Sequence, residues 1–411
     1  MVERNWAGNL EYSAATVHHP TTVDEIRGIV VGSQQVRVVG TRHSFNDIAD
    51  AERLISLDAL PDDVIVDPAG NTVELNPAMT YGHLAPLLHE RGLALHNLAS
   101  LPHISVGGAI ATGTHGSGDR LGNLATAVGA VDILRSDGEV VHLERGDADF
   151  DGAVVGLGAL GVVLRVRLDV EPEYQVAQHV YEGLAWAELA LRFDEITNAG
   201  DSVSLFTTWG SHVGQVWVKQ RLPAESNRNV SGARPATVDL HPIAEMSAEN
   251  CTPQLGVPGL WSDRLPHFKM GFTPSSGDEL QSELLLPREA ALDAIEIVRG
   301  FAEEMAPHLL VSEIRTVAAD SLWMSPQFER ATVALHFTWR QHTVEVMRLV
   351  DRIEEALGRF EPRPHWGKLF AVDGATLTAR YPRHRDFVDL VSRFDAPGAF
   401  RTSWLARNVL I

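Results

Sequence analysis

A glycine-rich stretch between Leu98 and Gly118 restricts most strongly what this chain can fold into. It reads Leu-Ala-Ser-Leu-Pro-His-Ile-Ser-Val-Gly-Gly-Ala-Ile-Ala-Thr-Gly-Thr-His-Gly-Ser-Gly. Glycine lets a backbone approach a bound group closely and exposes N–H groups that attract anions, so the stretch suits a flat, phosphate-bearing cofactor. Its spacing matches neither G-x-G-x-x-G nor G-x-x-x-x-G-K-[ST], which excludes the two common nucleotide loops. On glycine content alone, a surface loop is an equal alternative.

A second motif is a short β-branched strand that runs into a turn carrying a histidine. Residues 36–47 read Val-Arg-Val-Val-Gly-Thr-Arg-His-Ser-Phe-Asn-Asp. The pattern predicts a strand at 36–39, after which Gly40 permits a tight turn and His43 projects from it. A histidine alone in a turn is usually just solvated, so this motif gains meaning only in combination with others.

Length and composition limit the class of protein. A chain of 411 residues exceeds the size at which one hydrophobic core keeps growing, so two domains are expected. With 45% hydrophobic and 21% charged residues, its composition is that of an ordinary soluble globular protein. The net charge of −20 repels nucleic-acid phosphates and anionic lipid headgroups, so neither a nucleic acid nor a membrane is expected as a partner.

The sequence gives no sign of secretion or of disulfide bonds. Cys251 is its one cysteine, so an intramolecular disulfide is impossible. The first residues lack the charged and apolar regions of a signal peptide, and no run of about 18 apolar residues occurs. We therefore expect a cytoplasmic protein, and we expect it to be a monomer.

Local patterns predict both helices and strands in the first half of the chain. Thr22 and Glu25 form a capping box that begins a helix at 24–31, and Gly92 ends a second helix at 81–90. Asp137-Gly138 predicts the turn of a hairpin. Strands are expected at 36–39, 72–75, 131–134, 140–143 and 162–170, the last with alternating apolar and polar side chains.

The second half mixes strands with helices. A helix is expected to begin near Pro287, and others are expected at 343–357 and 383–394. Residues 223–258 show no clear period, which predicts an extended loop region. The patterns divide the chain into a first domain at 1–172, a second at 173–369 and a C-terminal segment at 370–411.

Further motifs follow one another along the chain. They are Asn5-Trp6-Ala7-Gly8-Asn9, Glu313-Ile314-Arg315, His336-Phe337-Thr338-Trp339 and His365-Trp366-Gly367-Lys368. The glycine-rich stretch and the His43 turn resemble the FAD-binding domain of the vanillyl-alcohol-oxidase type, also called the PCMH type, in which a histidine after the first strand is bonded to the isoalloxazine ring. With the further motifs, essentially the whole chain is similar to alditol oxidases, also called xylitol oxidases.

The resemblance implies a fold and a cofactor. The fold is α+β, with a PCMH-type FAD-binding domain at 1–172 and an α/β substrate domain, or cap, with a mixed or antiparallel sheet at 173–369. The segment 370–411 is implied to return to the FAD domain. FAD is the implied cofactor, attached covalently through His43, and no metal site is expected.

Two pairs of polar residues are spaced for one face of a β-strand. Glu313 and Arg315 are two apart, and so are His336 and Thr338, so each pair points to one side of its strand. If the two strands are neighbours, a carboxylate, a guanidinium, an imidazole and a hydroxyl meet in one pocket. Without the resemblance, a solvated Glu–Arg salt bridge and a surface lysine at Lys368 are the plainer alternatives.

The resemblance assigns these side chains to the oxidation of a polyol. Arg315 and Lys368 are expected to polarise the reacting C1 oxygen. His336 is the favoured acceptor of the hydroxyl proton, with Lys368 as a second candidate. We predict these three as the catalytic residues.

The same resemblance implies binding residues. Glu313 and Ser100 are expected to hold the further hydroxyls, with Arg315 and Lys368 also in contact with substrate, and Thr338 to contact both substrate and flavin. Ala99 either leaves room for O2 or simply packs. The implied FAD contacts are Gly40, Thr41, Arg42, His43, Ser44, Ser100, Ser105, Gly107, Gly108, Ala109, Ile110, Thr112, Gly113, Val162, Thr338 and His365.

Three functions are compatible with these residues. The leading one is an FAD-dependent alditol oxidase that converts the terminal hydroxyl of xylitol, sorbitol or glycerol to the aldose and reduces O2 to hydrogen peroxide. The second is a sugar-1,4-lactone oxidase or dehydrogenase of the same superfamily. The third, a non-catalytic flavin-binding protein, leaves the polar residues of the second domain unexplained.

Overall fold

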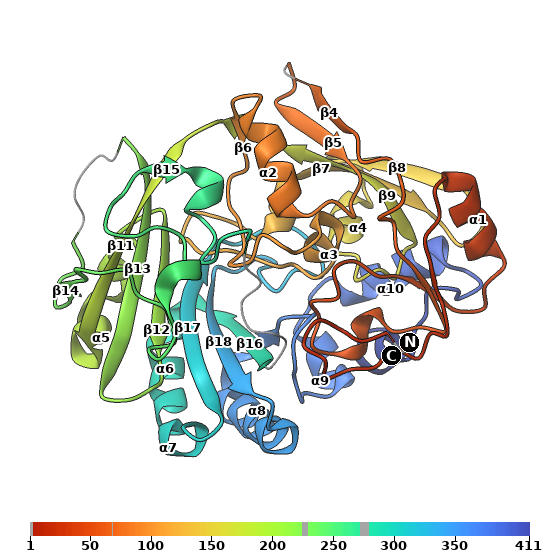
Figure 1. The fold of residues 1–411 in the computed structure, drawn as a ribbon. Helices are drawn as coiled ribbons and strands as arrows, with labels where there is room; N and C mark the ends of the chain where they lie inside the picture. Colours follow the sequence, from red (N-terminus) through yellow and green to blue (C-terminus); the bar gives the residue numbers. More distant parts are fainter. Residues whose placement is uncertain (1–2, 68, 224–228, 272–278) are drawn as a thin grey trace.

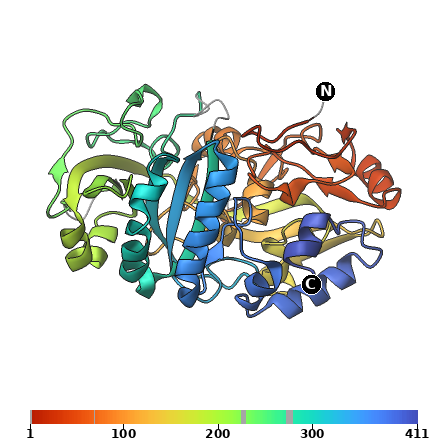
Figure 2. The same ribbon diagram turned by 90° about the horizontal axis from the view of Figure 1, so that it is seen from below.

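The chain folds into two halves that lie side by side, each built around a β-sheet (Figure 1). The structure is a computed structural model, and it describes residues 3–67, 69–223, 229–271 and 279–411. The first half holds the N-terminal part of the chain together with the C-terminal helices, and the second holds a larger sheet covered by helices (Figures 1 and 2). The predicted α+β class is confirmed.

The first half contains a mainly antiparallel framework in the described part of the chain. Its five-stranded sheet has the order β4 (Val64–Asp67), β5 (Thr72–Leu75), β9 (Val162–Asp169), β7 (Val128–Leu134), β8 (Val140–Glu144). A parallel sheet has the order β1 (Val17–His18), β3 (Arg53–Ile55), β2 (Val36–Val38), and β10 (Glu171–Pro172) pairs with β6 (Leu93–Ala94). The helices are α1 (Val23–Val31), α2 (Tyr81–His89), α3 (Val106–Ala111) and α4 (Phe150–Val154).

Local signals predicted this half well. The Thr22 hydroxyl accepts from the backbone N–H of Glu25 and begins α1, as expected. Gly92 follows α2 with a φ of +66°, and Gly138 turns the β7–β8 hairpin with a φ of +86°. Both angles lie in the left-handed region that favours glycine. The strand expected at 36–39 ends one residue earlier, at Val38.

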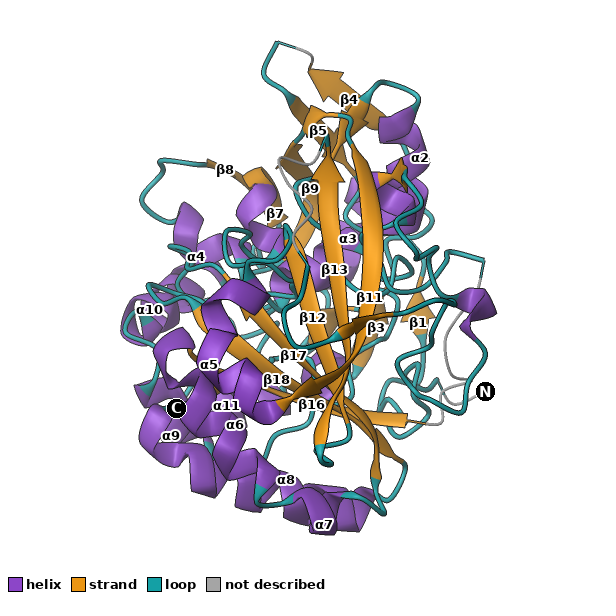
Figure 3. Cartoon of the chain, turned by 90° about the vertical axis from the view of Figure 1, so that its left-hand side faces the viewer, coloured by secondary structure: helices purple, strands orange, loops and turns teal. Residues whose placement is uncertain are grey.

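The second half is built on one long antiparallel sheet. In the described residues its order is β14 (Arg234–Pro235), β11 (Gln175–Ala185), β13 (His212–Leu222), β12 (Ser202–Thr207), β17 (Leu309–Val317), β18 (Thr332–Arg340), β16 (Glu279–Pro287), β19 (Arg363–Pro364), with β15 (Gly259–Leu260) beside β11. Figure 3 shows β11, β13 and β12 side by side at its outer end. Its helices are α5 (Trp186–Thr197), α6 (Ala291–Arg299), α7 (Ala302–Met305) and α8 (Thr343–Leu357).

Side chains along this sheet alternate between two very different faces. Leu335 and Phe337 of β18 and Ile314 of β17 belong to the hydrophobic cluster formed with α5, α6 and α8. Their neighbours in sequence, such as His336 and Glu313, line a cavity on the opposite face. Because successive side chains of a strand point to opposite sides, one sheet has both a hydrophobic core face and a polar face.

The C-terminal helices pack against the first half. They are α9 (Gly374–Ala379), α10 (His384–Phe394) and α11 (Ser403–Asn408). Leu377, Phe387 and Trp404 from these helices share a hydrophobic cluster with Val131 and Val166 of β7 and β9. Residues 370–411 therefore return to the half that holds the glycine-rich stretch.

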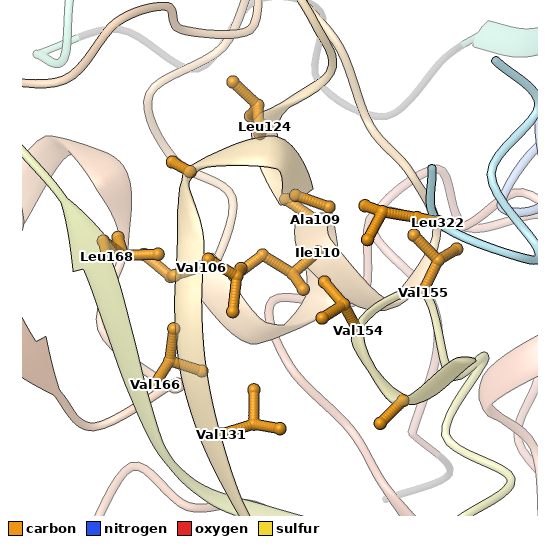
Figure 4. Close-up of a cluster of buried hydrophobic side chains, with 14 of the residues drawn as sticks. Val106, Ala109, Ile110, Leu124, Val131, Val154, Val155, Val166, Leu168 and Leu322 are labelled. Carbon is orange, nitrogen blue, oxygen red and sulfur yellow. The ribbon is translucent and has the colours of Figure 1, made fainter. Parts of the chain in front are cut away.

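The hydrophobic cluster of the first half also takes in part of the second. Helix α3 lies at its centre, where Val106 and Ile110 pack among residues of β7, β9 and α4 (Figure 4). Leu322 and Trp323, from the connection between β17 and β18, are buried in the same cluster. The chain thus crosses between the two halves within the range 173–369 as well as at its ends.

Two expectations for the second half need adjustment. Pro287 ends strand β16, and α6 begins at Ala291 after a short 3-10 turn, because the alternating segment before Pro287 forms an inner strand of the sheet. The region 223–258 is mostly irregular, as expected, although it contains β14; residues 224–228 lie outside the described residues. The 3-10 helices are Asp47–Ala49, Leu124–Ala127, Ala248–Asn250, Trp261–Asp263, Arg288–Ala290 and Gly358–Phe360.

A helix that crosses a bilayer needs about 20 predominantly apolar residues. Within the described ranges, none of the helices has both the length and the apolar character needed to cross a bilayer.

Gly161 provides a test of the packing between β7 and β9. Its φ is +143°, and an added Cβ would lie 2.3 Å from the carbonyl oxygen of Leu134. We expect Gly161→Ala to lower the melting temperature, because strained backbone typically costs about 1–3 kcal/mol. The matched control is Gly28→Ala in α1, where a Cβ meets open space and should stabilise by about 0.5–1 kcal/mol. Thermal melts followed by circular dichroism measure both, and an unchanged Gly161→Ala protein would contradict the packing.

Candidate active site

A cavity lies between the two halves of the molecule. On one side its walls come from the turn at 40–44 and from the glycine-rich stretch. On the other side they come from the polar face of the large sheet, through β12, β16, β17 and β18. The loop at 365–368 lines it where the halves meet, with bonds from Phe45 N–H to Gly367 O (2.8 Å) and from His365 N–H to Glu283 O (3.0 Å).

The N-terminal motif at 5–9 holds the turn that carries His43. Trp6 stacks on the His43 ring with the two centroids 5.2 Å apart. Asn5 and Asn9 donate through their side-chain amides to backbone carbonyls just after His43, at 2.9 Å each. Among the described residues, Nε2 of His43 is buried without a hydrogen-bond partner. Burial lowers the pKa of His43 to about 4, so the ring is neutral.

The glycine-rich stretch meets this turn at very close range. A Cβ at Gly40 would lie 2.4 Å from Ser105 Oγ, and one at Gly107 would lie 2.7 Å from Cβ of Pro77. The backbone N–H of Ser105 donates to Thr41 Oγ1 at 3.2 Å. A side chain at either glycine would clash with the neighbouring segment, so the glycines let the backbone segments close up into a cradle beside the cavity. The cradle, together with the unpartnered ring nitrogen, fits FAD.

Most of the predicted cofactor residues line the cavity. They are Gly40, Thr41, Arg42, His43, Ser44, Ser100, Ser105, Gly107, Gly108, Ala109, Thr112, Thr338 and His365. Ile110, Gly113 and Val162 do not. Ile110 points into the hydrophobic cluster (Figure 4), and Val162 is buried in another cluster while Val163 lines the cavity. Gly113 adopts a φ of +63° and faces the ring of Pro326.

Strand register brings the predicted polar residues together. β17 and β18 are neighbours, and Glu313 lies opposite His336. On the other side of β18, His336 lies opposite Glu283 of β16. A single cross-strand row therefore runs Glu283, His336, Glu313 on the polar face of the sheet.

Glu283 forms the centre of the site. Its side chain is fully buried, and its Oε1 accepts from Arg315 Nη2 at 2.6 Å while its Oε2 accepts from Lys368 Nζ at 2.7 Å. His115 Nε2 lies 3.3 Å from Oε1. Burial alone would raise the pKa of Glu283, but Lys368, Arg315 and His115 hold it well below its ordinary value. The carboxylate is thus charged and joins two cations side by side.

The two cations respond differently to burial. Burial lowers the pKa of Lys368, and Arg315 lowers it further, while Glu283 opposes the fall. For Arg315, burial also favours the neutral form, but Glu313 and Glu283 outweigh it and raise the pKa. Arg315 is therefore a permanent cation, and the charge of Lys368 depends on Glu283.

His336 is a neutral imidazole with a defined tautomer. Its Nδ1 lies 2.8 Å from Lys368 Nζ and its Nε2 lies 3.1 Å from Thr338 Oγ1. Because the ammonium can only donate, Nδ1 accepts, and Nε2 carries the hydrogen toward Thr338. Burial and the charge of Lys368 lower the pKa of His336 to about 3.

Glu313 has its own partners. His267 Nε2 lies 2.9 Å from Glu313 Oε1, and Arg315 Nε lies 3.6 Å from Oε2. Burial would raise the pKa of Glu313, but Arg315 and His267 outweigh it and lower the pKa. Ser100 lines the cavity nearby, and its carbonyl accepts from the backbone N–H of His267 at 3.1 Å.

Three residues of the site were not predicted from the sequence: Glu283, His115 and His267. Glu283 had a signal, since polar residues at 279, 281 and 283 alternate with Leu280, Ser282 and Leu284 as in a half-buried strand. His115 lies inside the glycine-rich stretch, where it belongs to no helical or strand period. His267 lies in an irregular segment, and no local pattern marks it.

Comparisons with known proteins show the family of the chain. A model for an FAD binding domain matches residues 14–144, and one for D-arabinono-1,4-lactone oxidase matches residues 279–408. An alditol oxidase from Streptomyces sp. (strain IKD472 / FERM P-14339) is 49% identical over 98% of this chain and 97% of its own length. An L-gulono-1,4-lactone dehydrogenase from Mycobacterium tuberculosis (strain CDC 1551 / Oshkosh) is 27% identical over 98% of each chain. Cholesterol oxidase from B. sterolicum shares the fold, with a TM-score of 0.80 at 13% identity over 98% of this chain and 96% of that one.

The FAD binding domain match and the 49% identity define an FAD-dependent oxidoreductase with a vanillyl-alcohol-oxidase-type cofactor domain. Its cofactor is FAD, as predicted. Within that class, the identity over nearly the full length of both proteins places the chain in the alditol oxidase family. Membership in a family of oxidoreductases excludes the third interpretation, a non-catalytic flavin-binding protein.

Glu283→Gln tests whether the carboxylate sets the charge of Lys368. Without Glu283 the pKa of Lys368 falls further, so the neutral form appears at lower pH. If catalysis needs the cation, the alkaline limb of the kcat/KM profile moves to lower pH, and kcat/KM falls. Removing one partner of a buried ion pair also costs about 3–5 kcal/mol, so the melting temperature falls.

Glu354→Gln is the matched control for that variant. Glu354 is also buried, on α8, but accepts from the backbone N–H groups of Ala371 and Val372, outside the cavity. Its replacement should affect stability and leave the alkaline limb in place. A Glu283→Gln enzyme with the wild-type limb would show that Lys368 does not depend on Glu283.

Proposed function

We propose that this protein oxidises the terminal C1 hydroxyl of linear polyols such as xylitol and sorbitol, and less efficiently glycerol, to the aldose, with reduction of O2 to hydrogen peroxide. The observation that carries the proposal is the row Glu283, His336, Glu313 with its cations Arg315 and Lys368, set in the cavity between the halves. FAD, when bound, accepts the hydride from the substrate carbon. The 49% identity to an alditol oxidase supports the substrate class.

Arg315 and Lys368 are proposed to act on the C1 oxygen. An ammonium has three donors, and in the described residues Lys368 gives two of them to Glu283 and His336. The third is available to a substrate oxygen in the cavity. Arg315 lies beside it on the same carboxylate, so both cations can stabilise negative charge on one oxygen.

His336 is proposed as the proton acceptor by way of Lys368. The Nδ1 lone pair of His336 faces Lys368 Nζ, so Lys368 passes one hydrogen to Nδ1 and takes up the hydroxyl proton in its place. With two cations at the C1 oxygen, positive charge on that oxygen is costly, so the hydroxyl proton must leave as the hydride leaves. An imidazole whose pKa is about 3 is a weak base. It suffices because loss of the hydride turns the hydroxyl into a strongly acidic protonated carbonyl.

Glu313, Ser100 and Thr338 are proposed to hold the substrate's further hydroxyls. Glu313 lines the cavity on β17, directly opposite His336 of β18. As an anion, it accepts hydrogen bonds from hydroxyl groups. Thr338 lies next to His336 on the same face of β18. A site with this many polar groups suits a chain that carries a hydroxyl on each carbon.

Covalent attachment of FAD through His43 is part of the proposal. The neutral ring lies in the cavity wall, and its Nε2 is buried without a partner in the described part of the chain. The stacked Trp6 fixes the plane of the ring. A neutral, oriented imidazole with a free lone pair is what bond formation to the flavin requires.

A sugar-1,4-lactone substrate is the second candidate. The D-arabinono-1,4-lactone oxidase model matches residues 279–408, which include Glu283, Arg315, His336 and Lys368. The lower identity to the lactone dehydrogenase, 27% against 49%, favours the polyol.

His43→Ala tests the covalent link. Wild-type protein precipitated with acid should retain its yellow flavin in the pellet, because a C–N bond survives denaturation. His43→Ala should release its flavin into the supernatant, measured by absorbance and fluorescence. The control is His103→Ala, a second histidine whose charge acts on His43 and which is not proposed to bind flavin. Complete release from the wild type would refute the link.

A substrate series tests the polyol site. We expect kcat/KM to fall from xylitol and sorbitol to glycerol and again to 1-propanol, because buried polar groups are left unpaired when hydroxyls are missing. Each lost contact should cost about 1–3 kcal/mol, or roughly one to two powers of ten. Peroxide release under air measures the series. Equal rates for 1-propanol and xylitol would contradict the proposal, and faster turnover of a sugar lactone would favour the second candidate.

A further inference from the structure

A lysine is buried in the second half of the molecule and does not line the cavity. Lys219 lies on β13 and is 1% exposed. Its Nζ donates to Leu265 O, to Pro266 O at 3.0 Å and to Nδ1 of His267 at 3.1 Å. These three bonds use all three ammonium hydrogens. An ammonium buried this completely is costly to remove from water, so its presence here calls for a reason.

His267 connects this lysine to the active site. Since Nδ1 accepts from Lys219, Nε2 carries the hydrogen and donates to Glu313 Oε1 at 2.9 Å. Burial and Lys219 lower the pKa of His267 to about 4, so the ring is neutral. Phe206 and Trp217 pack edge-on against it, with centroids 5.4 and 5.2 Å away. The imidazole is a fixed link between a buried cation and Glu313.

The backbone of His267 makes a second connection. Its N–H donates to the carbonyl of Ser100 at 3.1 Å, across the boundary between the two halves. Glu313 and Ser100 are two of the three residues proposed to hold substrate hydroxyls beyond C1, and Thr338 is the third. One residue therefore fixes Glu313 and Ser100, through its side chain and through its backbone.

We propose that Lys219 and His267 are positioning residues for substrate: through Glu313 and Ser100 they orient the groups that bind hydroxyls remote from the reacting carbon. Neither residue takes part in hydride or proton transfer. The inference rests on the proposed polyol oxidation. The site then has a binding group, made of Lys219, His267 and Glu313, and a reacting group, made of Glu283, Lys368 and His336. Arg315 contacts the carboxylates of both groups, Glu313 and Glu283.

The charges of the binding group depend on one another. Burial lowers the pKa of Lys219 to about 7, and the charge of Glu313 opposes that fall. Without Lys219, no donor faces His267 Nδ1, so the ring hydrogen is no longer confined to Nε2 and the hydrogen bond to Glu313 Oε1 is weakened. Substrate binding then weakens, while the Lys368–His336 pair at the C1 oxygen is unchanged.

Lys219→Met in the FAD-loaded enzyme tests this inference, with xylitol as substrate. The KM for xylitol should rise about tenfold or more, which corresponds to one weakened hydrogen bond to a charged group, while kcat stays within about threefold. The flavin spectrum and the melting temperature report whether the variant is folded. Should Lys219→Met not fold, His267→Phe keeps the ring packing, removes both side-chain bonds and should raise KM to a similar extent.

A double-mutant cycle separates positioning from a general loss of structure. If Lys219 acts through Glu313, Lys219→Met in a Glu313→Gln background should change the xylitol KM by less than about twofold. Thr252→Val is the matched control, because the Thr252 hydroxyl donates at 2.7 Å to Pro266 O, the same carbonyl that Lys219 binds. It loosens the same segment without touching Glu313 and should leave KM unchanged.

The outcomes are distinguishable. Additive effects of Lys219→Met and Glu313→Gln, an equal rise in KM for Thr252→Val, or a fall in kcat without a rise in KM would overturn the inference while the polyol function stands. A wild-type enzyme that oxidises no polyol would overturn the proposed function and this inference with it.

Discussion

A buried carboxylate between two cations is the interaction on which the rest of the site depends. Glu283 has no exposed surface, and its two oxygens bind Arg315 and Lys368. A charge removed from water in this way is stable only when it is paired and hydrogen-bonded. Two cations held this close would otherwise repel each other, so Glu283 makes the pair possible and holds it where the cavity opens.

The geometry behind this pairing is that of an ordinary antiparallel sheet. Alternation sends Leu335 and Phe337 toward the helices and His336 toward the cavity, and register aligns His336 with Glu283 on one neighbour and Glu313 on the other. The same strands thus supply the apolar core and the reactive surface. Stability of the core and precision of the site cannot be varied independently in this half.

Local sequence predicted those parts of the molecule that local forces determine. Capping at Thr22, the hairpin at Gly138 and the two-residue spacing of Glu313 and Arg315 depend on near neighbours, and each is found in the structure. The partners of Lys368 could not be predicted in the same way. They require the pairing of β16 with β18, whose residues are about fifty positions apart along the chain.

Other parts of the site depend on irregular segments. His267 reaches Glu313 from a stretch without helical or strand periodicity, so no pattern marked it. Glu283 lies in an alternating segment that forms β16, whereas Pro287 at its end favours the start of a helix. The loop at 365–368 has a wider consequence, because it is bonded both to β16 and to the residues just after His43. The reacting end of the cavity is therefore fastened to both halves, and any motion that spread the halves apart would have to break the bonds of this loop first.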